Sequence, residues 1–316
     1  MKNPAIAKFG MAIWVAALAL LGSAPGFSQN ESGQGQAVVT LLPKSGASTV
    51  PNVPAKDLVI TVNNKKATVT GLKSLQGPEN SVELVLMIDS SARGNLGTQF
   101  IEIEHFINAL PANTKVAIGY MQNGQTTFAA PLSASHTQVL SALHLPGGSA
   151  GSSASPYFCL SDLAKHWPSA DTGARRVVVM ITDGVDPYHL EIDMDDPYVE
   201  EAIKDSVHAK LVVYSIYWLN QGRFSSTGYG NFLGQNLLQQ VTQATGGKCF
   251  WIGVGNPVSF QPFFEELARR LQNQYELGFT SHLDGKAEVA FLKLKLKLPG
   301  TEVSTPQQVW VSPAAK

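Results

Sequence analysis

Two uninterrupted apolar runs in the middle of the chain lead into aspartates. Residues Leu84–Ile88 run into Asp89, and residues Val177–Ile181 run through Thr182 into Asp183. Such a run predicts a strand buried on both faces, which is typical of parallel sheets covered by helices. Ligands of these sheets bind beyond the carboxyl ends of the strands. We therefore expect both carboxylates at one rim of a sheet, close enough to share a cation.

The pattern around these runs predicts α/β structure over residues 81–274. Apolar runs alternate there with segments of helical spacing, and a short antiparallel strand is expected near residues 126–130. Asp196-Pro197 predicts a helix start, because Asp is a favoured N-cap and Pro suits the first helical position. We expect a Rossmann-like, doubly wound, mostly parallel sheet of about six strands.

Both ends of the chain predict β structure instead. Residues 29–80 and 275–316 hold short strands, with a hairpin turn at Asn63-Asn64. We expect the strands of residues 37–75 to pair with those of residues 275–316 in a small β-sandwich-like domain; two separate β tails are the alternative. The polar, Gly-rich segment 29–36 is expected to be a frayed end.

One C-terminal segment, Leu292–Leu298, alternates strictly between leucine and lysine. A period of two places the lysines on one face of a strand. That face is either a patch for an anionic surface or a solvated outer face that also discourages edge pairing.

Residues 1–28 have the pattern of a secretory signal peptide. Two lysines precede an apolar stretch of twelve residues, Gly10–Leu21, and small residues allow cleavage after Ser28. We expect a secreted or periplasmic protein with no transmembrane segment after cleavage; a retained signal anchor is the alternative. No cysteine lies near the cleavage site, which argues against a lipid anchor.

The net charge argues against one class of function, and the two cysteines allow two structural alternatives. The net charge is −1, and loss of residues 1–28 removes two lysines and no acid, leaving about −3. This balance argues against nucleic-acid binding. Cys159 and Cys249 form either a disulfide, which an oxidising compartment permits, or two buried thiols.

Three motifs in order resemble the von Willebrand factor type A (VWA) domain of bacterial exported proteins. They are residues Leu84–Arg93, the Ser-rich loop 149–155 and residues Ile181–Gly184. Thr245–Gly247, Phe264–Leu267 and Asn273–Phe279 match as well, so the resemblance covers roughly residues 81–280.

The resemblance implies a metal-ion-dependent adhesion site, in which Asp-x-Ser-x-Ser, a loop Thr and a later Asp hold Mg²⁺, Mn²⁺ or Ca²⁺. Asp89, Ser91 and Asp183 match this pattern. Ser149, Ser153 and Ser155 are candidates for the loop Thr, and Ser153 or Ser155 best keeps its spacing.

Arg93 stands where the family has its second Ser, so the site is degenerate. If Arg93 points inward, its guanidinium replaces the metal by pairing with Asp89 or Asp183. If it points outward, a weakened metal site survives.

The resemblance implies protein binding at the rim formed by residues 89–97, 149–157, 184–196 and 220–231. We therefore expect a non-enzymatic interaction protein without a cofactor, whose partner the sequence does not identify. The alternatives are a divalent-metal-dependent adhesion module and a hydrolase that uses the rim carboxylates. No nucleophile elbow is present, so no catalytic residue is predicted.

Overall fold

The computed structural model describes residues 31–44, 53–77, 80–92, 94–147, 155–189, 195–219, 227–253 and 255–314. Residues 1–28, Arg93, Ser149 and Ser153 lie outside this range, so the predictions made for them do too. Among the described residues, no helix is both long and apolar enough to cross a membrane.

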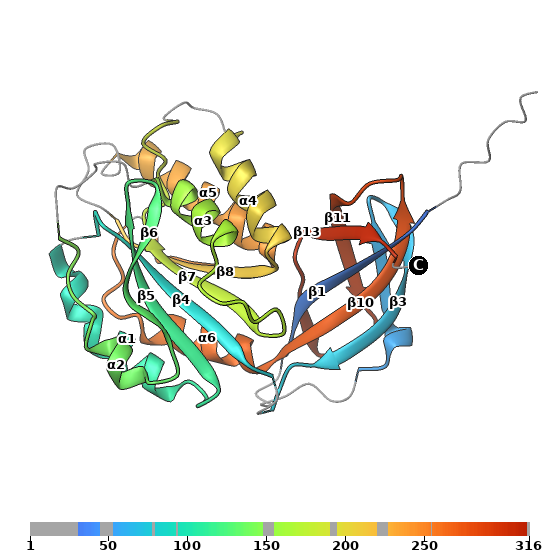
Figure 1. The fold of residues 1–316 in the computed structure, drawn as a ribbon, viewed down its shortest axis with the longest axis horizontal. Coiled ribbons are helices and arrows are strands. Elements are labelled where there is room, and N and C mark those ends of the chain that lie inside the picture. The colour runs from blue at the N-terminus through green and yellow to red at the C-terminus, as the bar shows by residue number, and fades with distance from the viewer. Residues whose placement is uncertain are drawn as a thin grey trace, which may run out of the picture. The chain divides into compact units, whose positions relative to one another are not determined.

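The centre of the chain forms a six-stranded sheet in the order β6-β5-β4-β7-β8-β9 (Figure 1). Its strands are β4 (Val82–Asp89), β5 (Thr114–Gln122), β6 (Gln125–Ser133), β7 (Arg175–Thr182), β8 (Leu211–Tyr217) and β9 (Cys249–Phe250). All neighbours are parallel except β5 and β6. The sheet is therefore mixed rather than a plain parallel VWA sheet, and the expected fold class was wrong in this respect.

In the described ranges, six α-helices cover the two faces of this sheet. They are α1 (Phe100–Ala109), α2 (His136–Leu140), α3 (Pro156–Lys165), α4 (Pro197–His208), α5 (Gly228–Thr245) and α6 (Gln261–Gln272), and a 3₁₀ turn, η2 (Gly94–Gln99), precedes α1. Residues of α1, α2 and α6 share one core cluster, whereas residues of α3, α4 and α5 share another. The central strands alternate between the two clusters, so they are buried on both faces, as the apolar runs predict.

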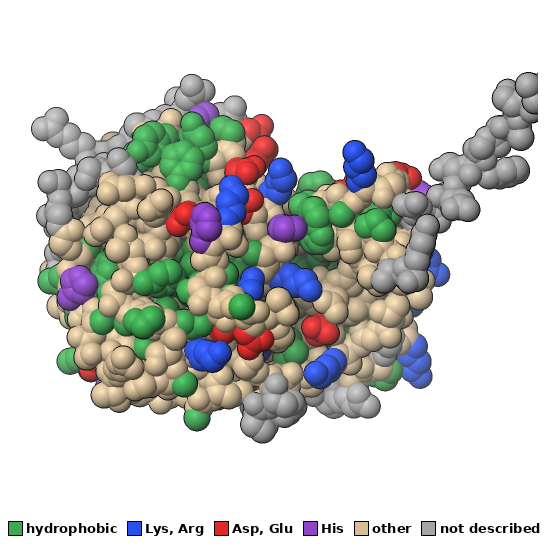
Figure 2. Space-filling view, in the orientation of Figure 1, with side chains coloured by type: hydrophobic (Ala, Val, Ile, Leu, Met, Phe, Trp, Pro, Cys, Tyr) green, Lys and Arg blue, Asp and Glu red, His purple; other side chains and the backbone are tan. Residues whose placement is uncertain are grey.

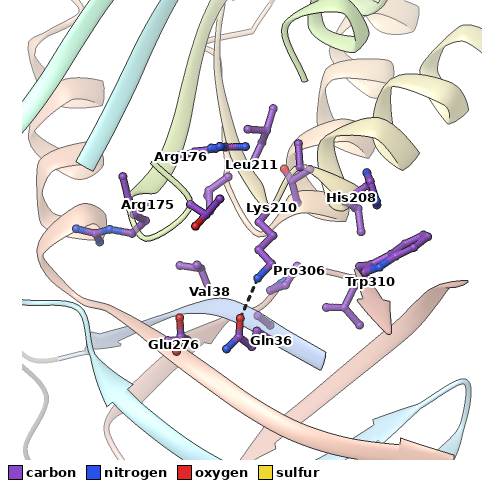
Figure 3. Close-up of a pocket in the computed structure, with 18 of the residues that line it drawn as sticks. Gln36, Val38, Arg175, Arg176, His208, Lys210, Leu211, Glu276, Pro306 and Trp310 are labelled. Carbon is purple, nitrogen blue, oxygen red and sulfur yellow. Dashed lines mark hydrogen bonds between the residues drawn. The ribbon is translucent and has the colours of Figure 1, made fainter. Parts of the chain in front are cut away.

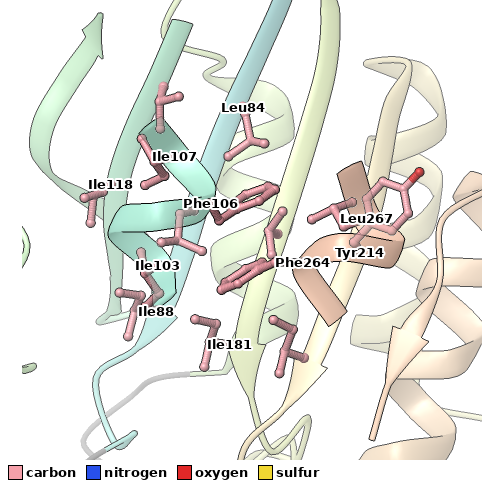
Figure 4. Packing of buried hydrophobic residues seen from close by; sticks show 14 of the residues in the cluster. Leu84, Ile88, Ile103, Phe106, Ile107, Ile118, Ile181, Tyr214, Phe264 and Leu267 are labelled. Atoms are coloured by element: carbon pink, nitrogen blue, oxygen red, sulfur yellow. The ribbon is translucent and has the colours of Figure 1, made fainter. Parts of the chain in front are cut away.

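The first of these clusters shows how the helices are held on the sheet (Figure 4). Phe106 of α1 stacks on Phe264 of α6 with 4.4 Å between ring centroids and an interplanar angle of 8°. Leu84 and Ile88, on alternate positions of β4, belong to the same cluster. Burying each such side chain contributes about 1.5–3 kcal/mol, so this packing fixes the strand ends that carry the rim.

Strands from both chain ends form a closed barrel, so the predicted β-sandwich was wrong. The strands are β1 (Glu31–Pro43), β2 (Leu58–Val62), β3 (Lys65–Ser74), β10 (Gln274–Leu283), β11 (Glu288–Leu296), β12 (Thr301–Ser304) and β13 (Gln308–Pro313), and η1 (Ala55–Asp57) precedes β2. The order β10-β3-β2-β11-β13-β1 closes because β1 also pairs with β10, and β12 pairs with the end of β1.

The barrel closes because β1 is long and has glycines at its start. Strand β1 begins at Glu31, so the expectation of a frayed end over residues 29–36 was wrong for its described part. One edge of β1 pairs with β10 over Glu31–Thr40, and Gly33–Gly35 on the other edge pair with β13. A Cβ atom at Gly35 would lie 2.3 Å from the Phe279 ring, so a glycine there lets that ring fill the interior.

Several local predictions are confirmed. Asn63 and Asn64 adopt positive φ angles of 47° and 63° in the β2–β3 hairpin. Asp196 caps α4, with Pro197 as its first residue. Strand β11 pairs with β13 over Glu288–Phe291 and with β2 over Leu292–Leu296, and Lys293 and Lys295 of the second half are exposed, as expected for a solvated outer face. Both cysteines are free and buried.

Candidate functional site

Adjacent strands bring the two predicted aspartates to the same rim. In the parallel pairing of β4 with β7, Ile88 is the partner of Ile181, so Asp89 at the end of β4 lies beside the Thr182-Asp183 segment. This is the carboxyl end of both strands, as the sequence predicts. Asp89 and Asp183 are only 2% and 3% exposed, so each needs local partners for its polar atoms.

Hydroxyl and amide donors hold the Asp89 carboxylate from both sides. Its Oδ1 accepts hydrogen bonds from the Ser91 amide at 2.9 Å and the Ser91 hydroxyl at 2.6 Å. Its Oδ2 accepts one from the Thr182 hydroxyl at 2.6 Å. The Thr182 Oγ1 in turn accepts from the Gly184 amide at 3.2 Å. Asp89 therefore connects the loop after β4 to the loop after β7.

Thr182 is a site residue that the sequence reasoning missed. The sequence pattern singles out the two acids, and Thr182 stands between the end of the apolar run and Asp183. Its position is nevertheless informative, because the last residues of neighbouring parallel strands face one another at the rim. A hydroxyl residue at the end of one strand, next to an Asp at the end of the other, is the signal that would have identified it.

Asp183 contacts a different part of the rim. Its Oδ1 accepts a hydrogen bond from the Val185 amide at 3.0 Å. Its charge adds to burial in raising the pKa of Tyr217. Helix α5 packs directly on this loop, because a Cβ atom at Gly234 would lie 2.0 Å from the Asp183 carbonyl oxygen. Only glycine permits that approach.

A second buried acid pair lies farther along the same loop. Asp186 accepts hydrogen bonds from the Ser155 hydroxyl at 3.0 Å and the Tyr188 amide at 2.8 Å. Burial raises the pKa of Asp186 and the charge of Asp196 adds to this rise, against the Tyr188 amide, which lowers it. Asp196 Oδ1 accepts from the first amides of α4, whereas its Oδ2 is buried and has no hydrogen-bond partner in the described structure.

The serine candidates for the family's loop Thr are therefore resolved in part. Ser155 bonds Asp186 and caps α3 by accepting from the Phe158 amide at 3.3 Å. These hydrogen bonds join Ser155 to the second acid pair. Ser153 and Arg93, the residues on which the metal and guanidinium alternatives depend, lie outside the described residues.

The described rim fits a divalent cation poorly. Carboxylate and hydroxyl oxygens are the ligands that Mg²⁺ prefers, and Asp89, Ser91 and Asp183 offer them. Both oxygens of Asp89 already accept hydrogen bonds, however. No group of three or more His, Cys, Asp or Glu side chains in the described residues is arranged to hold a metal.

For the hydrolase alternative, a triad of Ser90, His189 and Asp183 at the rim would lack a contact that it needs. His189 Nε2 is buried and has no hydrogen-bond partner in the described part of the chain. A Ser-His-Asp triad needs its imidazole bonded on both sides, to the nucleophile and to the acid. The arrangement therefore gives no support to that chemistry.

Exposed apolar side chains lie on several segments at the carboxyl ends of the strands. They follow β7 and β9, start α5 or precede α6, which places them at the carboxyl rim: Tyr188, Phe232, Trp251, Ile252 and Val258. Hydrogen bonds tie these segments together. Gln235 of α5 donates to the Gly253 carbonyl at 2.6 Å, and Gln99 donates to the Val258 carbonyl at 3.1 Å.

Two cavities of the described structure lie at the other end of the sheet. The first has a volume of about 530 Å³ and is lined by Arg175 and Leu211, which start β7 and β8. The second, of about 800 Å³, is lined by Val82 and Thr114, which start β4 and β5. Neither cavity contains a rim carboxylate.

No protein-family model and no curated protein matches this sequence. The chain is similar in structure to an aerotolerance-related membrane protein from Bacteroides fragilis NCTC 9343, with 14% identity over 60% of this chain and 98% of that one, at a TM-score of 0.45. It is also similar to BatB from Bacteroides thetaiotaomicron, with 14% identity over 60% of this chain and 97% of that one, at 0.42.

Human COPII-coat protein Sec24c is a third similar structure. The two chains are 12% identical, and the match covers 74% of this chain and 44% of Sec24c at a TM-score of 0.43. Identities and TM-scores this low do not assign the chain to a family.

Proposed function

We propose that this chain is an exported, non-enzymatic protein whose VWA-like α/β part binds a protein partner at the carboxyl rim of its sheet. The central strands that end in Asp89 and Asp183, with helices on both faces, support the fold part of this proposal. Fold alone does not determine function, so the binding role depends on the composition of the rim.

The exposed apolar side chains on the rim segments carry the proposal. Phe232 is 60% exposed and Val258 is 91% exposed, although both are large apolar side chains that fold interiors normally bury. Contiguous apolar surface with polar surroundings is typical of protein interaction sites. The partner should therefore present apolar side chains, packed around the polar loops that Asp89 and Asp186 hold in place.

In this proposal the buried carboxylates are structural. Asp89 fixes the loop after β4 to Thr182, and Asp196 fixes the start of α4, so the loops that carry the apolar side chains have defined positions. A degenerate site of this kind needs no metal, because hydrogen-bond donors already neutralise part of the carboxylate charge.

A divalent-metal-dependent adhesion module is the second candidate. The Asp89 carboxylate and Ser91 hydroxyl, 2.6 Å apart, favour it, since they are neighbouring hard oxygen donors at the rim that also carries Asp183. When bound, a cation there would supply an open coordination position for an acidic group of the partner. The two candidates differ in whether partner binding depends on Mg²⁺ or Mn²⁺.

Site-specific photo-crosslinking tests the proposed surface. A photoreactive phenylalanine analogue replaces Phe232 at the rim or, as a control, Phe291 on the barrel, which is 61% exposed against 60% for Phe232. In the envelope and secreted fractions of the source organism, we expect discrete protein adducts from position 232 only. The same adducts from both positions, or none from position 232, would contradict the proposal. Repeating the experiment with a chelator separates the two candidates.

The N-terminus of the native protein tests the proposed export. We expect cleavage after Ser28, so that the mature chain starts at Gln29, two residues before β1 begins at Glu31. Intact mass and N-terminal sequencing of the native protein give the start directly. A mature protein that retains residues 1–28 would contradict this part of the proposal.

A further inference from the structure

A cavity of about 530 Å³ lies at the amino ends of the central strands, at the opposite end of the sheet from the rim (Figure 3). Small-molecule sites usually have volumes of about 300–1,000 Å³. The cavity is walled by Arg175, Arg176 and Lys210 from the α/β part and by Val38, Glu276 and Trp310 from the barrel strands. Figure 2 shows Lys and Arg side chains gathered near the centre of one face of the molecule.

The basic side chains of this cavity outnumber its acids. In the described part of the chain, none of Arg175, Arg176 and Lys210 makes an ion pair. Glu276 is the acid among the lining residues, and His208 adds a further basic group when protonated. The cavity therefore has a net positive charge.

Arg175 is partly buried, and its donors are only partly satisfied. One terminal nitrogen donates to the Leu271 carbonyl at 2.9 Å and to the Gln274 side chain at 2.5 Å, and both acceptors are neutral. Its Nε is buried and has no hydrogen-bond partner in the described structure. Burial lowers the pKa of Arg175 to about 10, which still leaves it protonated at neutral pH. Only neutral groups contact this partly buried cation, so an anion in the cavity would stabilise it.

Lys210 and Arg176 are also held by neutral groups. Lys210 Nζ donates to the Gln36 side chain at 2.9 Å, a contact drawn across the cavity in Figure 3. Lys210 is exposed, so the cavity is open to solvent on that side. The Arg176 guanidinium lies 5.5 Å from the centre of the Trp167 ring. A ligand anion can replace or join these neutral contacts without breaking an ion pair.

The remaining wall of the cavity is apolar and aromatic. Val38, Leu211 and Pro306 line it together with Trp310, whose ring packs edge-to-face on His208 with 4.6 Å between centroids. A ligand that fits both walls has an anionic end and an apolar or aromatic body.

We propose that this cavity binds a small organic anion, a carboxylate or phosphate ester, with its charge at Lys210, in the positive potential of Arg175 and Arg176, and its apolar part against Trp310. The site is separate from the rim, so it does not depend on the proposed protein-binding function. It uses charge-assisted hydrogen bonds for the anion and buried apolar area for the body of the ligand.

Isothermal titration calorimetry with four ring compounds of similar size tests the charge requirement. Benzoate and phenyl phosphate carry the anion, benzamide is the neutral analogue and benzamidine the cation. We expect at least one anion to bind the mature chain at millimolar concentration, benzamide to bind more weakly and benzamidine not to bind. Failure of both anions, or equal binding of benzamidine, would overturn the proposal.

Charge-changing variants locate the binding in this cavity. Lys210→Asn keeps a residue that tolerates the positive φ of 59° at this position and should lower anion affinity about tenfold. Glu276→Gln removes the acid among the lining residues and should raise the affinity. Lys293→Gln, which removes an exposed lysine of β11 outside the cavity, is the matched control and should change nothing.

Thermal melts of each variant establish that it is folded before titration. Equal loss of affinity in Lys210→Asn and Lys293→Gln would show a non-specific charge effect and overturn the assignment. A decrease in affinity on Glu276→Gln would do the same. If Lys210→Asn does not fold, Arg176→Gln provides the same comparison from the other side of the cavity.

Discussion

Replacing Thr182 by valine tests whether the hydrogen bonds at Asp89 hold the rim together. Valine has nearly the same shape, and Thr182 is 0% exposed, so the change removes a hydroxyl without opening a cavity. Asp89 Oδ2 loses a donor at 2.6 Å, and the Gly184 amide loses its acceptor at 3.2 Å. A hydrogen bond to a charged group contributes about 1.5–3 kcal/mol, and an unsatisfied buried amide costs about 1–3 kcal/mol.

The extra methyl group of valine offsets part of this loss, by roughly 0.8 kcal/mol. We therefore expect Thr182→Val to lower the free energy of unfolding by about 2–5 kcal/mol. Urea unfolding at neutral pH, followed by circular dichroism, measures the change. Thr61→Val, on a partly exposed position of β2, is the matched control and should change the free energy by less than about 0.5 kcal/mol.

A double-mutant cycle with Asp89→Ala isolates the contact. Without the carboxylate, Thr182→Val should cost only what the Gly184 amide loses, so the two mutations should be coupled by at least about 1 kcal/mol. If Thr182→Val costs no more than Thr61→Val, or if the two mutations are additive, then Asp89 is not what connects these loops.

The remaining predictions concern metal, pH and thiols. Mg²⁺ or Mn²⁺ should not raise the melting temperature above its value in chelator, because both Asp89 oxygens already accept hydrogen bonds; a rise of several degrees would refute this and the idea that Arg93 replaces the metal. Burial raises the pKa of Glu266, but the hydrogen bond from Arg269 and nearby basic charges outweigh it and lower the pKa. The folded pKa thus lies below the unfolded one, so this stabilisation is present at neutral pH and is lost as the pH falls through the folded value. Glu266→Gln should therefore cost stability in urea at neutral pH and almost none about two units below the usual glutamate pKa of about 4.3; an equal cost at both would contradict the sign. Cys159 and Cys249 should react with a thiol reagent only after unfolding, because both are buried and burial raises the pKa of each thiol; rapid labelling of the native protein would show that one is accessible.

Local patterns predicted the rim well because strand ends are local features. An apolar run that ends in an acid indicates both a buried strand and the residue at its carboxyl end, so Asp89 and Asp183 were placed at one edge from sequence alone. The partner of Asp89 was missed, since Thr182 belongs to the site only through the register of two strands. The sequence of either strand alone does not determine the register between two distant strands.

The barrel was missed for a related reason. Alternating residues are equally compatible with a sandwich and with a barrel, because both bury one face of each strand. What separates them is whether the first strand pairs on both edges. In this chain the pairing of both edges of β1 depends on a polar, Gly-rich segment that includes Gly33 and Gly35. The composition of that segment is typical of a frayed end.

The barrel draws its strands from before and after the α/β segment, and this sets an order of events during synthesis. Strands β1–β3 leave the ribosome first, but Thr40 pairs with Gln274, more than two hundred residues later. Until then their open edges are exposed to pairing with other chains. We expect the α/β segment to fold first and to bring its two ends together; in the folded chain the Leu75 amide, just before the segment, donates to the Gln274 carbonyl at its end at 2.9 Å. A nascent chain that stalls after α6 would hold a folded sheet and an unfinished barrel, which makes its last forty residues a requirement for solubility.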